Sequence, residues 1–531
     1  MTLMRLIDFF PSCGAFAPDQ RVGFIVEVES ASPAAATLRI SITYLTTPVA
    51  TLNRPTRFAR GGQRIVIEWQ APSRAPRGYG AKVELLNESG VVDSASSAFD
   101  VLPHWTAFPR YGFLTDFSPG RANIDETIAS LSRFHLNGLQ FYDWQYRHDS
   151  LLSPETDYVD PLGRPLSLET VRGFITAAHT QGMAAMPYVA VYAASVDYWR
   201  AHSQEALYDT YGHALSFGEN FLGLMNPAPG GRWARHLLDE CGRVLASLSF
   251  DGLHVDQYGD PKTAFDAVGQ PVDLPAAFAG FVNAHKTSHP TSTVIFNAVG
   301  NWPIEALAAS PQDFAYIEIW PPATRYQDVA RIVTEARVLS GGKPVVIALY
   351  LPAERLANIC LADAIIFSCG GTRIELGERE RLLADPYFPK HQPLTPDLKT
   401  ALRRHYDFVV RYGDLIGPAA GHAFDCEIET LEGLWSTARI SEGWLTVCLV
   451  NMTGLSEPRW DVAHPAPARL ADIPVRATTP GRVREAWWAS PDLERIDLSP
   501  VSIQNESGAV SLTLPRLDYW AFVALRLDSE S

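Results

Sequence analysis

The stretch Gly252-Leu253-His254-Val255-Asp256-Gln257 follows residues Trp233–Leu248, in which apolar residues recur at helical spacing. A helical stretch followed by a short apolar run predicts a helix that leads into a strand buried on both faces. Seven more apolar runs of this kind occur between residues 105 and 424, most of them separated by amphipathic stretches. Strands that alternate with helices predict a parallel sheet, and eight such units predict an α/β fold of the (β/α)8, or TIM barrel, type.

The predicted elements can be placed along the chain. We expect barrel strands at Tyr111–Phe117, Gly138–Trp144, Met183–Tyr192, Gly252–Gln257, Thr293–Val299, Phe314–Trp320, Pro344–Tyr350 and Ala364–Cys369. The expected helices include Leu168–His179, Trp233–Leu248 and Asp397–Tyr412.

The regions on either side of the barrel have a different pattern. Thr37–Thr43 and Arg64–Trp69 alternate apolar and polar residues, which is the period of a half-buried strand. Short strands of this kind predict an immunoglobulin-like β-sandwich over residues 1–104. Strand patterns return at Leu445–Val450 and Trp520–Leu527 and predict a C-terminal β-sandwich over residues 425–531. The barrel is then expected to occupy residues 105–424.

Composition excludes several classes of function. The chain has 44 Lys and Arg against 59 Asp and Glu, a net charge of −15, so we expect no nucleic acid and no anionic membrane as a partner. Its six cysteines form no CxxC pair or Cys/His cluster, so no metal site and no cofactor are expected. The apolar run at the N-terminus is too short for a signal peptide. This predicts a cytoplasmic protein, or a secreted one if a leader has been removed.

The candidate chemistry lies where the predicted strands end, because the loops of a barrel converge at the carboxyl ends of its strands. Strand four ends at Asp256, and strand six reads Tyr316-Ile317-Glu318-Ile319-Trp320. A carboxylate such as Glu318 between apolar neighbours is costly to bury unless it is paired or used. Two carboxyl groups that face each other across the barrel mouth are what a glycosidase needs, one to support the anomeric carbon and one to protonate the leaving oxygen.

Aromatic and hydrogen-bonding residues gather at the other strand ends, as a sugar site requires. Flat rings suit the C–H faces of sugars, and amides and carboxylates suit their hydroxyl groups. We expect the substrate-binding residues to be Tyr142, Asp143, Trp144, Tyr192, His254, Gln257, Asn297, Trp320 and Glu375.

The segments Pro109–Phe113, Asn137–His148, Asp160–Arg164 and Val191–Ala194, together with the strands that carry the two acids, resemble glycoside hydrolase family 66. This family contains the dextranases and the cycloisomaltooligosaccharide glucanotransferases. The resemblance implies a retaining enzyme that cleaves α-1,6-linked glucan internally, with an α-glucan oligosaccharide or polysaccharide as its substrate. It also implies that Asp256 is the nucleophile and Glu318 the general acid/base.

The sequence leaves alternatives open. The cyclising members of the family carry a carbohydrate-binding module inserted in the barrel region, and no gap between the predicted strands is long enough for one here. Hydrolysis is therefore expected, with a glucanotransferase or another α-glucan transglycosylase as the alternative. A barrel glycosidase for another α-glycoside also stays open. A sugar-binding protein without activity is a remote alternative, because binding alone needs no pair of strand-end acids.

Overall fold

The computed structural model describes residues 4–71 and 77–528, so the first three residues of the N-terminal stretch considered above lie outside it. In this part of the chain the central sheet holds eight parallel strands, neighbours in chain order. They are β8 (Tyr111–Leu114), β9 (Gly138–Phe141), β12 (Ala184–Ala190), β16 (Gly252–Asp256), β19 (Thr293–Val299), β20 (Ala315–Glu318), β21 (Val345–Ala348) and β22 (Thr372–Ile374).

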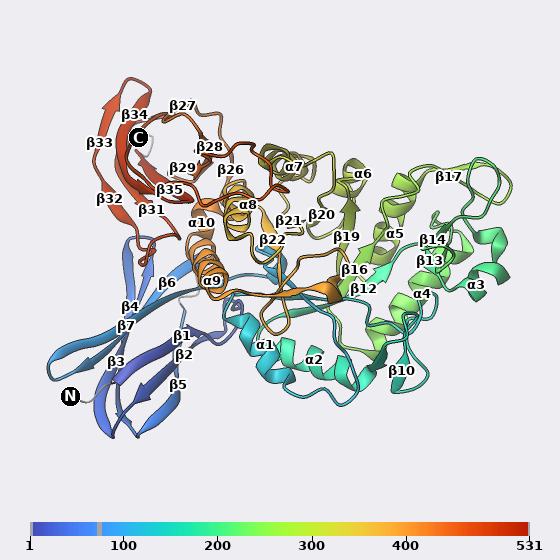
Figure 1. The fold of residues 1–531 in the computed structure, drawn as a ribbon, viewed down its shortest axis with the longest axis horizontal. Coiled ribbons are helices and arrows are strands. Elements are labelled where there is room, and N and C mark those ends of the chain that lie inside the picture. The colour runs from blue at the N-terminus through green and yellow to red at the C-terminus, as the bar shows by residue number, and fades with distance from the viewer. Residues whose placement is uncertain (1–3, 72–76, 529–531) are drawn as a thin grey trace.

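The sheet curls so that its two ends approach each other. The short strand β23 (Leu376–Gly377) comes directly after β22 and pairs in parallel with β8 through Gly377 and Phe113. A Cβ atom at Gly377 would stand 2.4 Å from the ring of Phe113, so this approach requires glycine. The result is a mixed α/β fold with one large curled sheet (Figure 1).

Helices cover the outside of this sheet (Figure 1). The larger ones are α1 (Ile124–Ser132), α2 (Leu168–Thr180), α4 (Arg232–Ser247), α5 (Leu274–Ser288), α7 (Tyr326–Leu339), α8 (Leu356–Ser368) and α9 (Pro396–Arg411). Their starts carry ordinary helix signals. Asp273 caps α5 by accepting a hydrogen bond from the Ala276 amide at 3.0 Å, and Thr395 caps α9 just before Pro396.

One predicted strand is wrong. Residues Ala364–Cys369 lie in and just after helix α8, and the eighth strand is β22, a few residues further along the chain. Twelve of the thirteen residues of α8 are buried, because α7, α9 and strand β29 (Trp444–Asn451) pack around it. A helix buried on every side loses the apolar period that distinguishes a helix from a buried strand.

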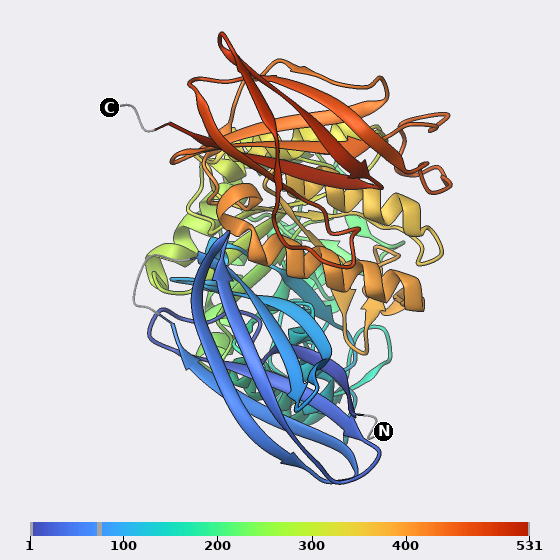
Figure 2. The same cartoon turned by 90° about the vertical axis from the view of Figure 1, so that its left-hand side faces the viewer.

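Two groups of β-sheets flank the curled sheet, one at each terminus of the chain (Figure 2). The N-terminal group pairs the sheet β1-β2-β5 with the sheet β4-β3-β6-β7, and the C-terminal group pairs the sheets β26-β28-β29-β35-β31-β32 and β27-β30-β34-β33. Each group encloses a hydrophobic core of its own. The N-terminal strands are β1 (Met4–Pro11), β2 (Arg21–Ser30), β3 (Ala34–Tyr44), β4 (Thr47–Phe58), β5 (Gly61–Gln70), β6 (Arg77–Asn87) and β7 (Gly90–Val101). The longer C-terminal strands are β28 (Leu434–Ser441), β29, β30 (Leu470–Thr478), β31 (Val483–Ala489), β34 (Ala509–Leu517) and β35 (Trp520–Leu527), and the shorter ones are β26 (His422–Ala423), β27 (Ile428–Glu429), β32 (Ser499–Val501) and β33 (Ile503–Glu506).

Helix α9 connects the N-terminal sheets to the curled sheet. Its Asp407 accepts hydrogen bonds from the Ser97 hydroxyl at 2.9 Å and from the Ala98 amide at 3.1 Å, and it contacts His135 at 2.8 Å. A buried ion pair between Arg110 and Asp100 supports the same junction. The exact domain boundaries, near residues 104 and 424, stay a prediction.

A long excursion follows β12 and builds one wall of the site. It contains α3 (Val196–Ala201) and the small sheet of β13 (Ala193–Ala194), β14 (Ser216–Phe217) and β15 (Leu222–Leu224). No helix within residues 4–71 and 77–528 has the length and apolar character needed to cross a membrane.

Candidate active site

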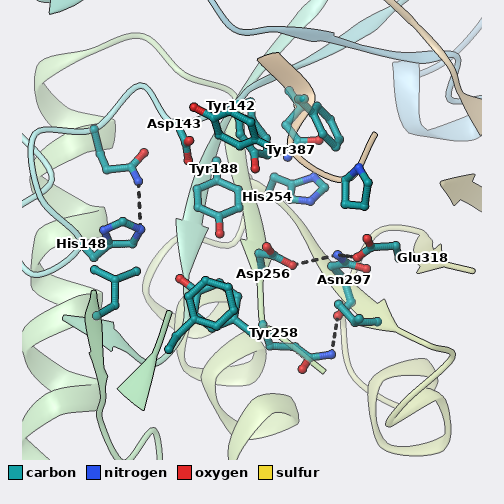
Figure 3. Close-up of a pocket in the computed structure, with 18 of the residues that line it drawn as sticks. Tyr142, Asp143, His148, Tyr188, His254, Asp256, Tyr258, Asn297, Glu318 and Tyr387 are labelled. Carbon is teal, nitrogen blue, oxygen red and sulfur yellow. Dashed lines mark hydrogen bonds between the residues drawn. The ribbon is translucent and has the colours of Figure 1, made fainter. Parts of the chain in front are cut away.

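A cavity of about 550 Å³ lies at the carboxyl ends of the parallel strands (Figure 3). Such a volume is in the usual range for a ligand site. Its floor comes from β9, β12, β16, β19 and β20, and the β14–β15 excursion and the segment Pro386–Phe388 form parts of its wall. The predicted residues that line it are Tyr142, Asp143, His254, Asp256, Gln257, Asn297, Glu318 and Trp320.

The two predicted catalytic carboxylates are joined by one amide. Asn297 of β19 lies between Asp256, which ends β16, and Glu318, which ends β20 (Figure 3). Its Nδ2 atom donates to Asp256 Oδ1 at 2.8 Å and to Glu318 Oε2 at 2.9 Å. These two distances limit the separation of the two carboxylate oxygens to at most their sum, 5.7 Å.

Burial changes the proton affinity of both acids. It raises the pKa of Asp256 to about 7, with a further contribution from the negative charge of Glu318. Burial also raises the pKa of Glu318, although hydrogen bonds from Tyr350, whose hydroxyl donates to Oε1 at 2.6 Å, and from Asn297 act in the opposite direction. Two interacting carboxyl groups of this kind titrate as a pair, so these shifts belong to the pair rather than to either residue alone.

Aromatic rings surround the pair. Tyr142 stacks on Phe388 with ring centroids 4.5 Å apart, and Tyr258 stacks on Phe217 at 4.2 Å. Trp320 follows Glu318 and keeps 39% of its surface exposed at the cavity. Flat, partly open rings beside an acid pair can hold the C–H faces of sugar units.

Asp143 supplies a third carboxylate to the cavity. Its backbone is left-handed, with φ of 51°, and its Oδ2 pairs with Arg164 at 3.1 Å. Arg164 also binds Asp160 and lies 3.4 Å from the hydroxyl of Tyr387. Burial raises the pKa of Asp143 to about 6 despite the guanidinium of Arg164.

His254 and Gln257 build the floor. Burial lowers the pKa of His254 to about 3, so its ring is neutral, and its Nδ1 lies 3.2 Å from the hydroxyl of Tyr111. The Gln257 amide donates to the Trp302 carbonyl at 3.2 Å, and its oxygen accepts from the Gly259 amide at 2.6 Å. Gln257 therefore holds the loops after β16 and β19 together.

Three predicted binding residues lie behind the cavity wall, which corrects the expectation that they contact sugar. Trp144 is fully buried, and its indole donates to the Tyr188 carbonyl at 3.2 Å. Tyr192 is 1% exposed, and its hydroxyl accepts from the Tyr258 amide at 2.7 Å, so it supports the backbone of a lining residue. Glu375 is fully buried against Arg373, at 3.1 Å, on the outer side of the sheet.

Several lining residues were not among the predicted ones. Tyr350 ends the predicted seventh strand, so the rule that pointed to Asp256 could have found it. Tyr188 lies in the predicted third strand, where the same rule already points to it. Phe217 and Tyr387 lie on excursions, far along the chain from the ends of the eight parallel strands, and no sequence pattern marks them. Within the described residues, no group of three or more His, Cys, Asp or Glu side chains is placed to hold a metal ion.

Known proteins resemble this chain in sequence and in fold. Residues 14–524 match the family described as Glycosyl hydrolase family 66. A cycloisomaltooligosaccharide glucanotransferase from Niallia circulans is 25% identical over 92% of this chain and 68% of its own length. A dextranase from Streptococcus salivarius is 19% identical over 85% of this chain and 68% of its own length.

A solved structure extends the likeness to three dimensions. The crystal structure of a Paenibacillus sp. cycloisomaltooligosaccharide glucanotransferase, complexed with cycloisomaltoheptaose, superposes with a TM-score of 0.90 at 20% identity. The superposition covers 99% of this chain and 100% of that one. Because the family match extends from residue 14 to residue 524 and confirms the resemblance seen in the sequence, the chain belongs to glycosyl hydrolase family 66.

Proposed function

We propose that this protein cleaves internal bonds of α-1,6-linked glucan by a retaining double displacement, with Asp256 as nucleophile and Glu318 as general acid/base. One observation carries the mechanism. The bridging contacts of Asn297 keep the two carboxylate oxygens within 5.7 Å. Retaining glycosidases hold their carboxyl groups about 5–5.5 Å apart, and inverting ones need roughly 6.5–9.5 Å to admit a water molecule.

The chemistry proceeds in two steps. Glu318 gives its proton to the glycosidic oxygen while Asp256 attacks the anomeric carbon and forms a covalent glycosyl ester. The departing sugar is then replaced by water, and Glu318 takes a proton from that water as it attacks. Two inversions restore the α configuration. The partly exposed ring of Trp320 and the carboxylate of Asp143 are proposed to bind the sugar units beside the bond.

The choice of substrate rests on family membership and on the named relatives, a dextranase and a glucanotransferase. The net charge of −15 fits a neutral glucan better than a nucleic acid or an anionic membrane. We also propose that the curled sheet is a complete (β/α)8 barrel, in which β22 and β23 together form the eighth strand. The parallel pairing of β23 with β8 supports this closure.

The second candidate is a cycloisomaltooligosaccharide glucanotransferase. This candidate is favoured by sequence identity, because a relative of that name is 25% identical to this chain and the dextranase is 19% identical. Its alignment spans 670 positions, more than the 531 residues here, so that relative has segments with no counterpart in this chain. Cyclisation needs the far end of the glucan to return to the anomeric carbon, and extra binding surface must offset the entropy of that loop.

The mechanism is tested with Asp256→Ala and Glu318→Gln. Each variant should keep a native circular dichroism spectrum and lose several orders of magnitude in turnover of dextran. Azide added to the Asp256→Ala variant should give a glycosyl azide of inverted configuration, because azide attacks the face that the aspartate has vacated. Turnover above a tenth of the wild-type rate in either variant contradicts the assigned role, and a first-formed β-anomer in NMR contradicts retention.

A further inference from the structure

The amide of Asn297 is committed to the two carboxylates. Its side chain is 5% exposed, and its nitrogen has two hydrogens, which serve Asp256 Oδ1 and Glu318 Oε2. The orientation of the amide follows from chemistry, because the group that faces two carboxylate oxygens must be the donor. An amide nitrogen can donate but cannot accept. Both oxygens that it contacts are therefore acceptors throughout the reaction.

The other oxygen of Glu318 has a different partner. Oε1 lies 2.6 Å from the hydroxyl of Tyr350. A hydroxyl group can either donate or accept by rotating its hydrogen. When Glu318 is protonated, both oxygens already face a donor, and Oε1 is the one whose partner can turn its hydrogen away from the added proton. Tyr350 can adapt to that proton and Asn297 cannot.

We propose that Asn297 is a positioning residue that sets the separation of Asp256 and Glu318 and directs the transferable proton of Glu318 to Oε1, where Tyr350 adapts to its departure and return. This inference rests on the proposed function. In the first step, the proton leaves Oε1 for the glycosidic oxygen as the C–O bond breaks and the bond from Asp256 to the anomeric carbon forms. In the second step, Oε1 takes the proton of the attacking water as the new C–O bond forms and the ester bond breaks. Neither hydrogen bond of Asn297 has to change.

The surrounding groups bring no unpaired charge to the pair, and the further donors that act on it, Tyr188 on Asp256 and Trp320 on Glu318, are neutral. The tyrosines that face the carboxylates have their pKa raised well above 10 by burial and stay neutral, and they are Tyr142, Tyr188, Tyr258, Tyr316 and Tyr350. His254 is neutral, because burial lowers its pKa to about 3. Asp143, the third carboxyl group of the cavity, is paired with Arg164.

The experiment compares the pH dependence of kcat/KM in the wild type and three variants. Asn297→Ala removes a donor from both acids, so the acidic and basic limbs should both move up by about one pH unit, the effect of one hydrogen bond to a charged group. Tyr350→Phe removes a donor from Glu318 alone and should move only the basic limb. Tyr387→Phe deletes a hydroxyl in the same cavity that contacts Arg164 and neither catalytic acid, so its limbs should not move, whatever its turnover.

A second readout covers a variant that is too slow on glucan. A glucose-configured cyclitol epoxide alkylates the nucleophile with help from the acid, and intact mass gives the labelling rate at each pH. The same shifts are expected in this rate. If Asn297→Ala loses its native circular dichroism spectrum, Asn297→Ser is measured instead, and smaller shifts of both limbs support the proposal.

If the pH profile of kcat/KM in the Asn297 variant keeps both limbs at their wild-type positions and only KM rises, Asn297 is a sugar ligand and the positioning role is overturned. Equal movement of both limbs in Tyr350→Phe overturns the division of the two Glu318 oxygens. The proposed function fails separately, if Asp256→Ala or Glu318→Gln keeps its activity.

Discussion

Two tryptophans near the catalytic pair should respond in opposite ways to the same substitution. Trp144 is fully buried, with its ring centroid 5.1 Å from that of Phe250 and its indole bound to the Tyr188 carbonyl. Trp320 lines the cavity with 39% of its surface exposed. We expect Trp144→Ala to damage stability and Trp320→Ala to damage catalysis.

The magnitudes follow from burial. Removing a buried Trp side chain costs about 3–5 kcal/mol, which lowers a thermal midpoint by roughly 5–10 °C in a region of this size. For Trp320, 39% of a side chain of roughly 250 Å² is about 100 Å². If a sugar face covers about half of that area at about 25 cal/mol per Å², the loss is about 1.2 kcal/mol, or roughly eightfold in kcat/KM.

The assay measures the thermal midpoint and the kcat/KM for dextran of both variants side by side, well below either midpoint. Trp144→Ala should keep kcat/KM within a fewfold of wild type, and Trp320→Ala should keep its midpoint within about 2 °C. A stable Trp144→Ala protein with impaired kcat/KM would refute the placement of this ring in the core. Unchanged kcat/KM in Trp320→Ala would remove that ring from the substrate platform.

Three further outcomes are expected. Burial raises the pKa of Asp256 to about 7, so its ionisation destabilises the fold as pH rises from about 4 to about 7. The increase in thermal midpoint that Asp256→Asn produces should therefore grow across that window and level off above it. Asp19→Asn, at an exposed position, is the control and should show no such trend. Burial raises the pKa of Glu375 to about 8, so Glu375→Gln imitates the protonated form and should keep both the thermal midpoint and kcat/KM. Glu375→Ala should lower the midpoint. A large rise in KM for the Gln variant would instead place Glu375 in the sugar site. Mass spectrometry of early dextran digests should find linear isomaltooligosaccharides, and a dominant series lighter by one water would assign the glucanotransferase activity instead.

The positions of the two acids could be predicted because they depend on a simple rule. Asp256 and Glu318 end parallel strands separated by a single strand, β19, and the carboxyl ends of such strands meet at one edge. The residue on that middle strand, Asn297, then falls between them. The helical period of α4 and α9 and the strands of the flanking sheets could be predicted on the same kind of local evidence.

Trp144 shows where this rule stops. Gln140 and Tyr142 both line the cavity, so the alternation of a strand would also place Trp144 there. Asp143 interrupts the alternation with a left-handed backbone, and the ring of Trp144 turns into the core. Asp residues adopt the left-handed conformation more readily than most others, but no sequence pattern predicts which Asp does so. Helix α8 was missed for a related reason, since the burial that erased its period comes from distant segments.

The charge surroundings of Asp256 and Glu318 differ from those of three other carboxyl groups. Asp143, Glu375 and Glu378 each contact an arginine, namely Arg164, Arg373 and Arg121. Within the described residues, the charge of Glu318 and neutral donors such as Asn297 act on Asp256, neutral donors such as Asn297 and Tyr350 act on Glu318, and no cation is among these groups. A nearby cation favours the ionised form of a carboxyl group, and an apolar pocket without donors favours the protonated form. Neutral donors beside a buried pair allow one negative charge and one proton to coexist, which is the state that a nucleophile and an acid need at the same pH. The neutral amide of Asn297 thus holds the two carboxyl groups of the pair together without placing a cation beside them.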